Sequence, residues 1–413
     1  MTWGDRRATL RGVTDSGTQP ASIQTPPPGR ILEIARYFTF LGFTAFGGPA
    51  AHVALMEEEL VHRRHWLEPQ HFLDLLATIN FVPGPNSTEL AIGLGRLRGG
   101  VRGLIVAGIC FILPAVLIIL PIGWVYVRFH HLSRFNGFMH GASAAVVAIV
   151  AVAAMRFAQS TIKDPLGAMI ALLAAMGELL NHRLGLGWMD VAILGAAGVV
   201  GALRAGPSVR LRSMAMAPLA AIFGAAAGGV TMPVLMALIF LKIGATLFGS
   251  GYLLVTYLQD SFVDHHHWLT SQQVLDAVTV GQVTPGPLLT TATFIGFILG
   301  YDNFGGGLVG GVVCGVIATA AIFAPAFIII GIFGGWLERL RMLPGARGAL
   351  NAMNAAVVGL IGATCVALGR QALSGPWRLL SMILIGAALV ILLRTRINAT
   401  YVLVGAGLLG LLY

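Results

Sequence analysis

Phe46-Gly47-Gly48-Pro49 and Pro83-Gly84-Pro85 each occur a second time, as Phe248-Gly249-Ser250-Gly251 and Pro285-Gly286-Pro287. Both pairs are separated by the same offset of 202 residues, so no gap falls between the two motifs. Further along, the offset becomes 211, and the second copy is therefore about nine residues longer than the first. A duplication of this length in a hydrophobic chain is typical of a membrane protein built from two related halves.

The duplication divides the chain into four parts. Residues 31–213 form the first repeat and residues 232–413 the second, and an apolar segment, residues 214–231, connects them. Residues 1–30 are polar and contain several prolines and arginines, and no apolar stretch precedes them. We therefore expect a disordered cytoplasmic tail at the N-terminus rather than a signal peptide.

The composition indicates a membrane protein. The 413 residues are 56% hydrophobic and 10% charged, whereas a soluble protein carries about 25% charged residues. Apolar runs of about 20 residues recur, for example 103–127 and 307–332, and each is long enough to cross a bilayer as a helix. The sequence predicts an all-α polytopic membrane protein with about 10–13 transmembrane helices.

The net charge of +9 does not point to nucleic acid, because the basic residues do not form one patch. They occupy short loops such as 96–102, as in the cytoplasmic loops of membrane proteins. Loop 96–102 has three arginines, whereas its counterpart, residues 301–303, has no basic residue. Opposite charge at equivalent loops favours repeats of inverted topology, although loops 128–134 and 339–347 are both basic.

No cofactor is expected. The chain lacks a Gly-Lys-Ser or Gly-Lys-Thr sequence and therefore a P-loop for ATP. Cys110, Cys314 and Cys365 lie in separate apolar runs without metal-ligand spacing. Residues 265–267 are three histidines, but consecutive residues rarely converge on one ion, so no metal site is predicted there.

Glycine and proline interrupt the helices four times, twice in each repeat. Irregular backbone is tolerated at membrane depth only where it is buried in protein or lines a cavity. Each break exposes the N-terminus of a following helix, whose free N–H groups attract an anion, and pseudosymmetry would bring the breaks to one site. Kinked spanning helices and re-entrant hairpins are both compatible with the pattern. The predicted substrate-binding residues are Gly47, Gly48, Pro49, His52, Pro83, Gly84, Pro85, Asn86, Ser87, Lys242, Gly249, Ser250, Gly251, Pro285, Gly286 and Pro287.

Several ionisable residues lie in or beside the apolar runs. Lys242 precedes the third break; an intramembrane cation costs at least about 3 kcal/mol, so we predict an anion contact, with neutralisation by a carboxylate as the alternative. Asp74 and Asp276 are equivalent in the two repeats, and could carry protons or hold the broken helices by hydrogen bonds. Glu89 suits a helix cap or a proton carrier, and His52 suits a packing or a titrating residue.

At these residues the chain resembles the chromate ion transporter (CHR) family in its long, two-domain form. The resemblance covers residues 31–413 and implies a bacterial-type plasma-membrane protein that exports chromate, an oxyanion shaped like sulfate. The residues that carry it are Phe46-Gly47-Gly48-Pro49 with His52, Trp66, Pro83-Gly84-Pro85, Lys242-Ile243-Gly244 and Phe248-Gly249.

The sequence and the resemblance together predict a carrier rather than an enzyme. It would export chromate by alternating access, driven by the membrane potential or by ion exchange. Sulfate or another oxyanion is the alternative substrate, because Ser250 stands where the family commonly has glycine. An intramembrane enzyme acting on a lipid phosphate is a remote alternative, since the apolar runs lack clustered aspartates for magnesium. Besides the lipid bilayer, a homodimer is compatible with the sequence.

Overall fold

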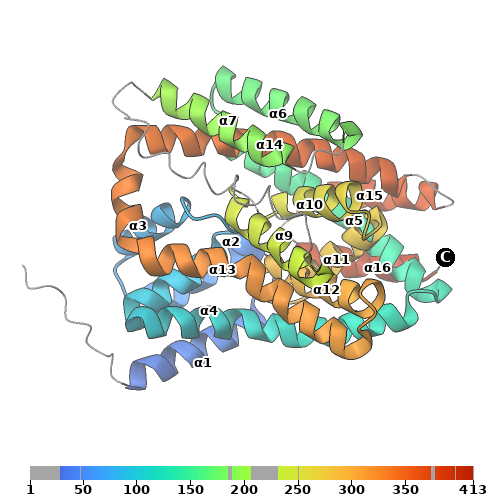
Figure 1. Cartoon of the computed structure of the whole chain (residues 1–413), viewed down its shortest axis with the longest axis horizontal. Helices are drawn as coiled ribbons and strands as arrows, with labels where there is room; N and C mark the ends of the chain where they lie inside the picture. Colours follow the sequence, from blue (N-terminus) through green and yellow to red (C-terminus); the bar gives the residue numbers. More distant parts are fainter. Residues whose placement is uncertain are drawn as a thin grey trace, which may run out of the picture.

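Figure 1 shows the computed structural model, which describes residues 28–46, 48–184, 188–205, 231–249, 251–373, 377–395 and 397–412. The described part contains 15 α-helices and no strand, which confirms the predicted all-α class. The longest helices run side by side along the long axis of the molecule. The N-terminal tail up to residue 27 and the connecting segment up to residue 230 lie outside the described residues.

Proline begins two of the helices in the segment predicted as the first repeat. Pro69 and Pro165 occupy the first position of their helices, where the missing N–H group has no intrahelical partner to lose. The elements are α1 (Pro28–Thr44), α2 (Gly48–Glu57), the π-helix η1 (Glu58–Arg63), α3 (Pro69–Ile79), α4 (Ser87–Phe129), α5 (Ser133–Thr161), α6 (Pro165–Leu184) and α7 (Met189–Arg204).

The segment predicted as the second repeat follows a similar order of elements. Thr270 and Gln273 form a capping box at the start of α11, in which each side chain accepts from the other residue's backbone N–H group. The elements are α9 (Met232–Thr246), α10 (Leu253–Leu258), the π-helix η3 (Gln259–His265), α11 (Ser271–Val283), the 3₁₀ turn η4 (Leu288–Thr290), α12 (Thr291–Ile298), the π-helix η5 (Leu299–Asn303), α13 (Gly307–Met342), α14 (Pro344–Ala372), α15 (Arg378–Arg394) and α16 (Ala399–Gly410).

The breaks are the tips of hairpins, because the helices on either side of each break contact one another. Around the first break, the Tyr37 hydroxyl donates to the Leu55 carbonyl (3.4 Å). Around the second, a β-carbon on Gly93 would lie 3.3 Å from Ile79 Cδ1 and 3.4 Å from Leu75 Cδ1. Of the two arrangements compatible with the sequence, the structure therefore has the hairpin at these breaks.

Within the described residues, four helices are long and apolar enough to cross a membrane, namely α4, α5, α13 and α14. Shorter apolar helices cover Pro165–Asn181, Met232–Thr246 and Ala399–Gly410. The helix α4 also bends sharply at Gly99 and Gly100, where the backbone leaves helical geometry and a β-carbon on Gly95 would lie 2.4 Å from the Gly103 carbonyl. The number of spans, about 10–13 by the count of apolar runs, stays a prediction.

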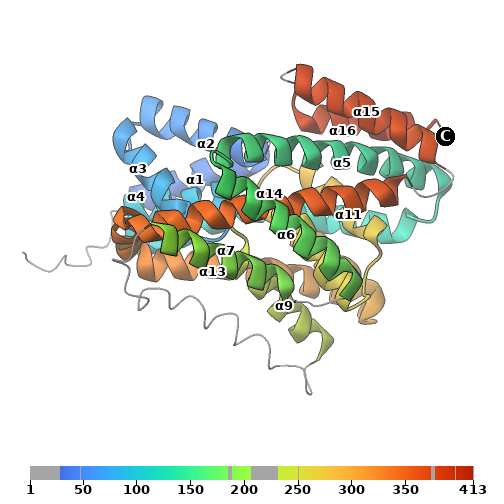
Figure 2. The same ribbon diagram turned by 90° about the horizontal axis from the view of Figure 1, so that it is seen from above.

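The last helices of each half pack against the other half. In Figure 1, α6 and α7 lie along α14, and in Figure 2, α15 and α16 lie along α5. Glycine permits both contacts: a β-carbon on Gly201 would lie 2.1 Å from the Gly348 carbonyl oxygen, and one on Gly410 would lie 2.1 Å from the Gly137 carbonyl oxygen. The two halves are thus interlocked, and the largest buried apolar cluster spans both of them.

Helices α9 and α13 pack closely at Gly244, where a β-carbon would lie 2.0 Å from the Ile322 carbonyl oxygen. Gly244→Ala is expected to destabilise the protein by about 1–3 kcal/mol, because the two backbones must move apart. The midpoint of thermal unfolding in detergent measures this loss. Gly386→Ala, at a helical glycine of α15 with no atom within 4 Å, is the matched control and should not lower the midpoint. Equal midpoints for both variants would contradict the close packing.

Candidate functional site

The four hairpin tips meet through a reciprocal pair of hydrogen bonds. The Gly84 N–H group, in the second break, donates to the Leu247 carbonyl at the end of α9 (2.6 Å). The Gly286 N–H group, in the fourth break, donates to the Ala45 carbonyl at the end of α1 (3.1 Å). Each Pro-Gly-Pro break is therefore held against the first hairpin of the other half.

Gly251, in the third break, joins these two pairs. A β-carbon on Gly251 would lie 3.2 Å from Pro85 Cβ and 3.5 Å from Leu288 Cδ2, so the third break touches both the second and the fourth. Its neighbour Tyr252 lines one small cavity together with Gly48, at the start of α2. The structure therefore brings the four breaks together.

The cavity between the breaks is too small for a tetrahedral oxyanion. Its volume is about 10 Å³, which corresponds to roughly one water molecule. The hairpin tips are therefore closed around the site in this conformation. The lining residues are Ala45, Gly48, Pro49, Tyr252, Gly281, Gln282, Thr284, Gly286 and Leu288.

Left-handed backbone occurs in all four breaks. Gly48 has φ +78° and Gly249 has φ +79°, while Gly84 and Gly286, equivalent in the two Pro-Gly-Pro motifs, have φ +146° and +100°. A side chain is disfavoured at such angles, which explains why the tips require glycine. The predicted residues Gly47 and Ser250 lie outside the described part of the chain.

His52 positions the first break rather than standing free in the cavity. It is buried on α2, its Nε2 lies 3.1 Å from the Ala45 carbonyl oxygen, and its ring packs edge-on against Phe111. The same carbonyl accepts the Gly286 N–H group, so His52 and Gly286 share one acceptor. This arrangement corresponds to the packing role that the sequence left open for His52.

The second break contains the residues 86–89 at the start of α4. Asn86 occupies the N-cap position with φ +67°, but its side chain makes no capping hydrogen bond, because this backbone angle differs from that of an ordinary N-cap. Ser87 and Glu89 are fully buried within the tip. Glu89 packs on Gly84, where a β-carbon would lie 1.9 Å from Glu89 Oε1.

Asp276 and Asp74 occupy different surroundings although they are equivalent in sequence. The buried Asp276 carboxylate accepts from the Tyr126 hydroxyl (2.7 Å), the Ser143 hydroxyl (3.0 Å) and Gln272 Nε2 (2.9 Å). Its bonds tie α11 to α4 and α5. The Asp74 side chain is 47% exposed and lies 3.1 Å from an Arg341 nitrogen on α13. In both places the carboxylate links helices.

Asp276→Leu is expected to destabilise the protein by about 3 kcal/mol or more, because three donors lose their acceptor and each buried unpaired group costs about 1–3 kcal/mol. Asp74→Asn, at the equivalent but exposed position, should cost less than about 1 kcal/mol. Thermal unfolding of the two variants in detergent compares them directly. If both variants lowered the unfolding midpoint by the same amount, the buried Asp276 would stabilise the protein no more than the exposed Asp74.

Lys242 lies beside carboxylates rather than at a hairpin tip. Its ammonium group interacts electrostatically with Asp260 on η3 and Asp190 on α7. Both carboxylates are buried, as are Glu178 and Asn181 on α6; Asn181 Nδ2 donates to Asp260 Oδ1 (2.8 Å). The structure therefore shows the partners expected for the alternative role of Lys242, neutralisation by carboxylates, and the predicted anion contact stays a prediction.

The sequence did not predict this buried polar cluster or several of the residues at the tips. Glu178 and Asp190 are carboxylates within apolar helices, a signal that marks functional or paired groups in membranes. Gln282 lines the cavity, and its buried Nε2 has no acceptor among the described residues. Asn354, on α14, lies close to Gly249 in the third break, because a β-carbon on Gly249 would be 2.7 Å from Asn354 Oδ1. Gln282 and Asn354 are amides within apolar runs, and this pattern could have predicted both.

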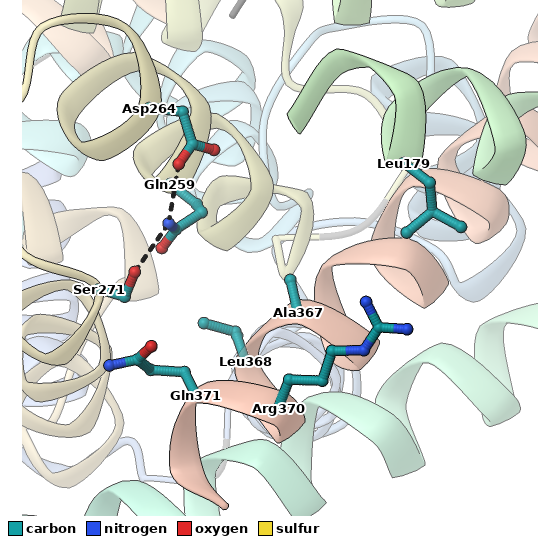
Figure 3. A pocket seen from close by; sticks show the side chains of 8 residues that line it. All are labelled: Leu179, Gln259, Asp264, Ser271, Ala367, Leu368, Arg370 and Gln371. Atoms are coloured by element: carbon teal, nitrogen blue, oxygen red, sulfur yellow. Dashed lines mark hydrogen bonds between the residues drawn. The ribbon is translucent and has the colours of Figure 1, made fainter. Parts of the chain in front are cut away.

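A larger cavity lies away from the breaks, between η3, α11 and the end of α14 (Figure 3). Its volume is about 310 Å³. Gln259 Nε2 donates to Asp264 Oδ1 (3.3 Å) and to the Ser271 hydroxyl (2.9 Å) along one wall, and Arg370 lies across from them. Asp264 and Arg370, which carry opposite charges, both line this cavity. Its lining therefore does not favour an anion, and we do not take it as the candidate site.

A polytopic all-α protein whose broken helices meet at one buried point has the architecture of a membrane transporter. The chain belongs to the chromate transporter family, whose model matches residues 32–202 and 234–411. These segments fall inside the two predicted repeats. The chain is a multi-pass membrane protein of the bacterial inner membrane, as the family and the apolar helices indicate.

Curated relatives support the assignment over most of their length. The chain is 30% identical over 401 residues to the chromate transport protein of Cupriavidus metallidurans, covering 95% of this chain and 96% of that protein. It is 30% identical to the chromate transport protein of Pseudomonas aeruginosa, covering 96% and 95%. It is 31% identical to the probable chromate transport protein of Synechococcus elongatus, covering 85% and 88%. No solved structure matches the chain.

Proposed function

We propose that the protein is a carrier that exports chromate through the point where the four hairpin tips meet. The observation that carries the proposal is the reciprocal pairing of Gly84 with Leu247 and of Gly286 with Ala45, which gathers the tips at one place. Helix N-termini in the first and second breaks, together with the Gln282 amide, offer N–H donors there. A tetrahedral dianion needs several such donors, yet must be bound loosely enough to leave.

The transport mechanism would be alternating access between two halves of inverted topology, residues 31–213 and 232–413. The closed cavity of about 10 Å³ must widen towards one side of the membrane at a time to admit the anion. The tips are held by single backbone hydrogen bonds between the halves, which relative movement of the halves can break and remake. Rocking of one repeat against the other around a fixed site is a common way for such folds to work.

The membrane potential supplies enough energy for export. A charge that leaves a negative interior gains about 2.3 kcal/mol per 100 mV, so a dianion gains about 7 kcal/mol at roughly 150 mV. Because 1.36 kcal/mol is a factor of ten, this corresponds to about five decades of concentration gradient. The proposed carrier therefore needs no ATP-binding site.

Thermal unfolding of the purified protein with added anions tests the proposed substrate class. An anion that binds only the folded protein raises the unfolding midpoint, by an amount that grows with the logarithm of the anion concentration above its Kd. We expect chromate and sulfate, which share shape and charge, to raise the midpoint, and chloride at the same ionic strength not to do so. A larger effect of sulfate would make sulfate the preferred substrate. Equal midpoints with all three anions would contradict an oxyanion site.

A further inference from the structure

Glu89 has unusual surroundings at the second break. Its side chain is fully buried, and neither carboxylate oxygen makes a hydrogen bond of normal geometry to a described residue. The donors that face it are the backbone N–H groups of Asn86 and of Glu89 itself, at the N-terminus of α4. The buried hydroxyls of Ser87 and Thr88 likewise have no partner in the described part of the chain. The tip therefore holds a carboxyl group and two hydroxyls with unused hydrogen-bonding capacity.

No charged group in the described part of the chain faces the Glu89 carboxyl group. Several ionisable side chains on the elements packed around α4 are bound to other groups. Glu33 of α1 binds Arg98, and the His52 ring of α2 lies against the Ala45 carbonyl. Asp74 of α3 binds Arg341 of α13, and Asp276 of α11 binds Tyr126. Arg96 of α4 lies against Gly334 of α13. Glu89 thus has neither a counter-charge nor a full set of donors.

A carboxylate cannot stay ionised in such an enclosure. Burying a lone ionised carboxylate is so costly that the group takes up a proton instead. In the closed conformation Glu89 is therefore a neutral carboxylic acid. When the hairpin tips separate and water reaches Glu89, the charged form is solvated and the proton can leave.

We propose that Glu89 carries one proton through the closed conformation, so that the carrier exchanges one proton for one oxyanion. This inference rests on the proposed function. A proton from the outer aqueous phase binds one oxygen of the Glu89 carboxylate and forms an O–H bond. The closed form, whose cavity has no room for an oxyanion, returns inward with that proton. The O–H bond breaks when the site opens to the cytoplasm, the proton enters the water there, and an oxyanion leaves in the opposite direction.

Only one of the two halves carries this carboxyl group at its Pro-Gly-Pro tip. The equivalent residue of the second half is Thr291, whose hydroxyl donates to the Leu288 carbonyl (2.8 Å). A hydroxyl at this position is therefore compatible with a closed tip. This asymmetry gives one proton per cycle, and it provides Glu89→Thr as a substitution that copies the residue of the protein's own second half.

The test uses the purified full-length protein in liposomes, with chromate outside, both solutions above neutral pH and the membrane potential clamped at zero. With the lumen one pH unit more acidic than the outside, the wild-type protein should accumulate chromate about tenfold, because one proton leaves for each anion that enters. Glu89→Gln and Glu89→Thr should lose this accumulation and keep uptake driven by an interior-positive potential. Glu58→Gln, at an exposed carboxylate on η1, should behave as the wild type.

The inference is overturned if wild-type uptake follows the potential but ignores the pH gradient, or if an alkaline lumen drives it. It is also overturned if either Glu89 variant keeps the wild-type response to pH. Absence of uptake under both the pH gradient and the potential would instead overturn the proposed function, and this inference with it. If Glu89→Gln does not fold, Glu89→Thr carries the test, because threonine occupies the equivalent position in the second half.

Discussion

Gly84→Ala is expected to reduce chromate transport at least about tenfold. Gly84 has φ +146°, an angle that costs a residue with a side chain about 1–3 kcal/mol. The added methyl group would also lie 1.9 Å from Glu89 Oε1, so the carboxyl group must move. Displacement of this tip would weaken the hydrogen bond from the Gly84 N–H group to Leu247. Chromate flux into liposomes, normalised to folded protein, measures the effect; 1.4 kcal/mol already corresponds to a factor of ten.

Gly305→Ala is the matched control for backbone strain. Gly305 also has positive φ, +69°, but a β-carbon there would meet no atom within 4 Å. We expect a modest loss of stability from Gly305→Ala and nearly normal flux per folded protein. If Gly84→Ala transported as well as Gly305→Ala, the second break would not be part of the transport site.

Lys242→Met is expected to cause the second large loss, in both folded protein and transport. Lys242 is partly buried and interacts electrostatically with the buried carboxylates Asp260 and Asp190. Removal of a cation that offsets buried carboxylates costs about 3–5 kcal/mol. Gel-filtration yield and the thermal midpoint in detergent report the loss of fold, and flux per folded protein reports the loss of transport.

Asp260→Asn in the Lys242→Met background separates the two roles of the lysine. Asparagine keeps an oxygen that can accept from Asn181 Nδ2 but removes one negative charge from the cluster. If Lys242 neutralises the carboxylates, the double variant should regain most of the lost stability and transport. If Lys242 contacts the anion, stability should return without transport. No recovery of either would contradict a coupling between Lys242 and Asp260.

The sequence predicted the helical class and the places where the helices break. Glycine and proline at 47–49, 83–85, 249–251 and 285–287 disfavour a continuous helix whatever the tertiary structure. The contacts between the breaks follow from tertiary packing. Whether Gly84 meets Leu247, for example, depends on how the second hairpin docks onto the other half, and no local pattern encodes that distance.

The role of individual polar residues was less predictable. Asp74 and Asp276 are equivalent in sequence, yet one is half-exposed and the other is buried with three donors. At the offset of 211, Leu337 and Asn354 stand where the donors Tyr126 and Ser143 stand in the first half. Lys242 was predicted at the anion site from its apolar surroundings and from its place just before the third break. Asp260, with which Lys242 interacts, lies on η3, eight residues before Trp268. Only the fold brings Lys242 and Asp260 together.

Chromate uptake into everted membrane vesicles tests whether the hairpin tips form an oxyanion pathway. The vesicles contain either the wild-type protein or Gly84→Ala at equal amounts, and an interior-positive potential is imposed with and without excess sulfate. We expect the potential to drive chromate into wild-type vesicles, sulfate to compete, and Gly84→Ala vesicles to take up at least about tenfold less. Equal uptake in the two kinds of vesicle, or none under any potential, would contradict an oxyanion carrier built around these hairpin tips.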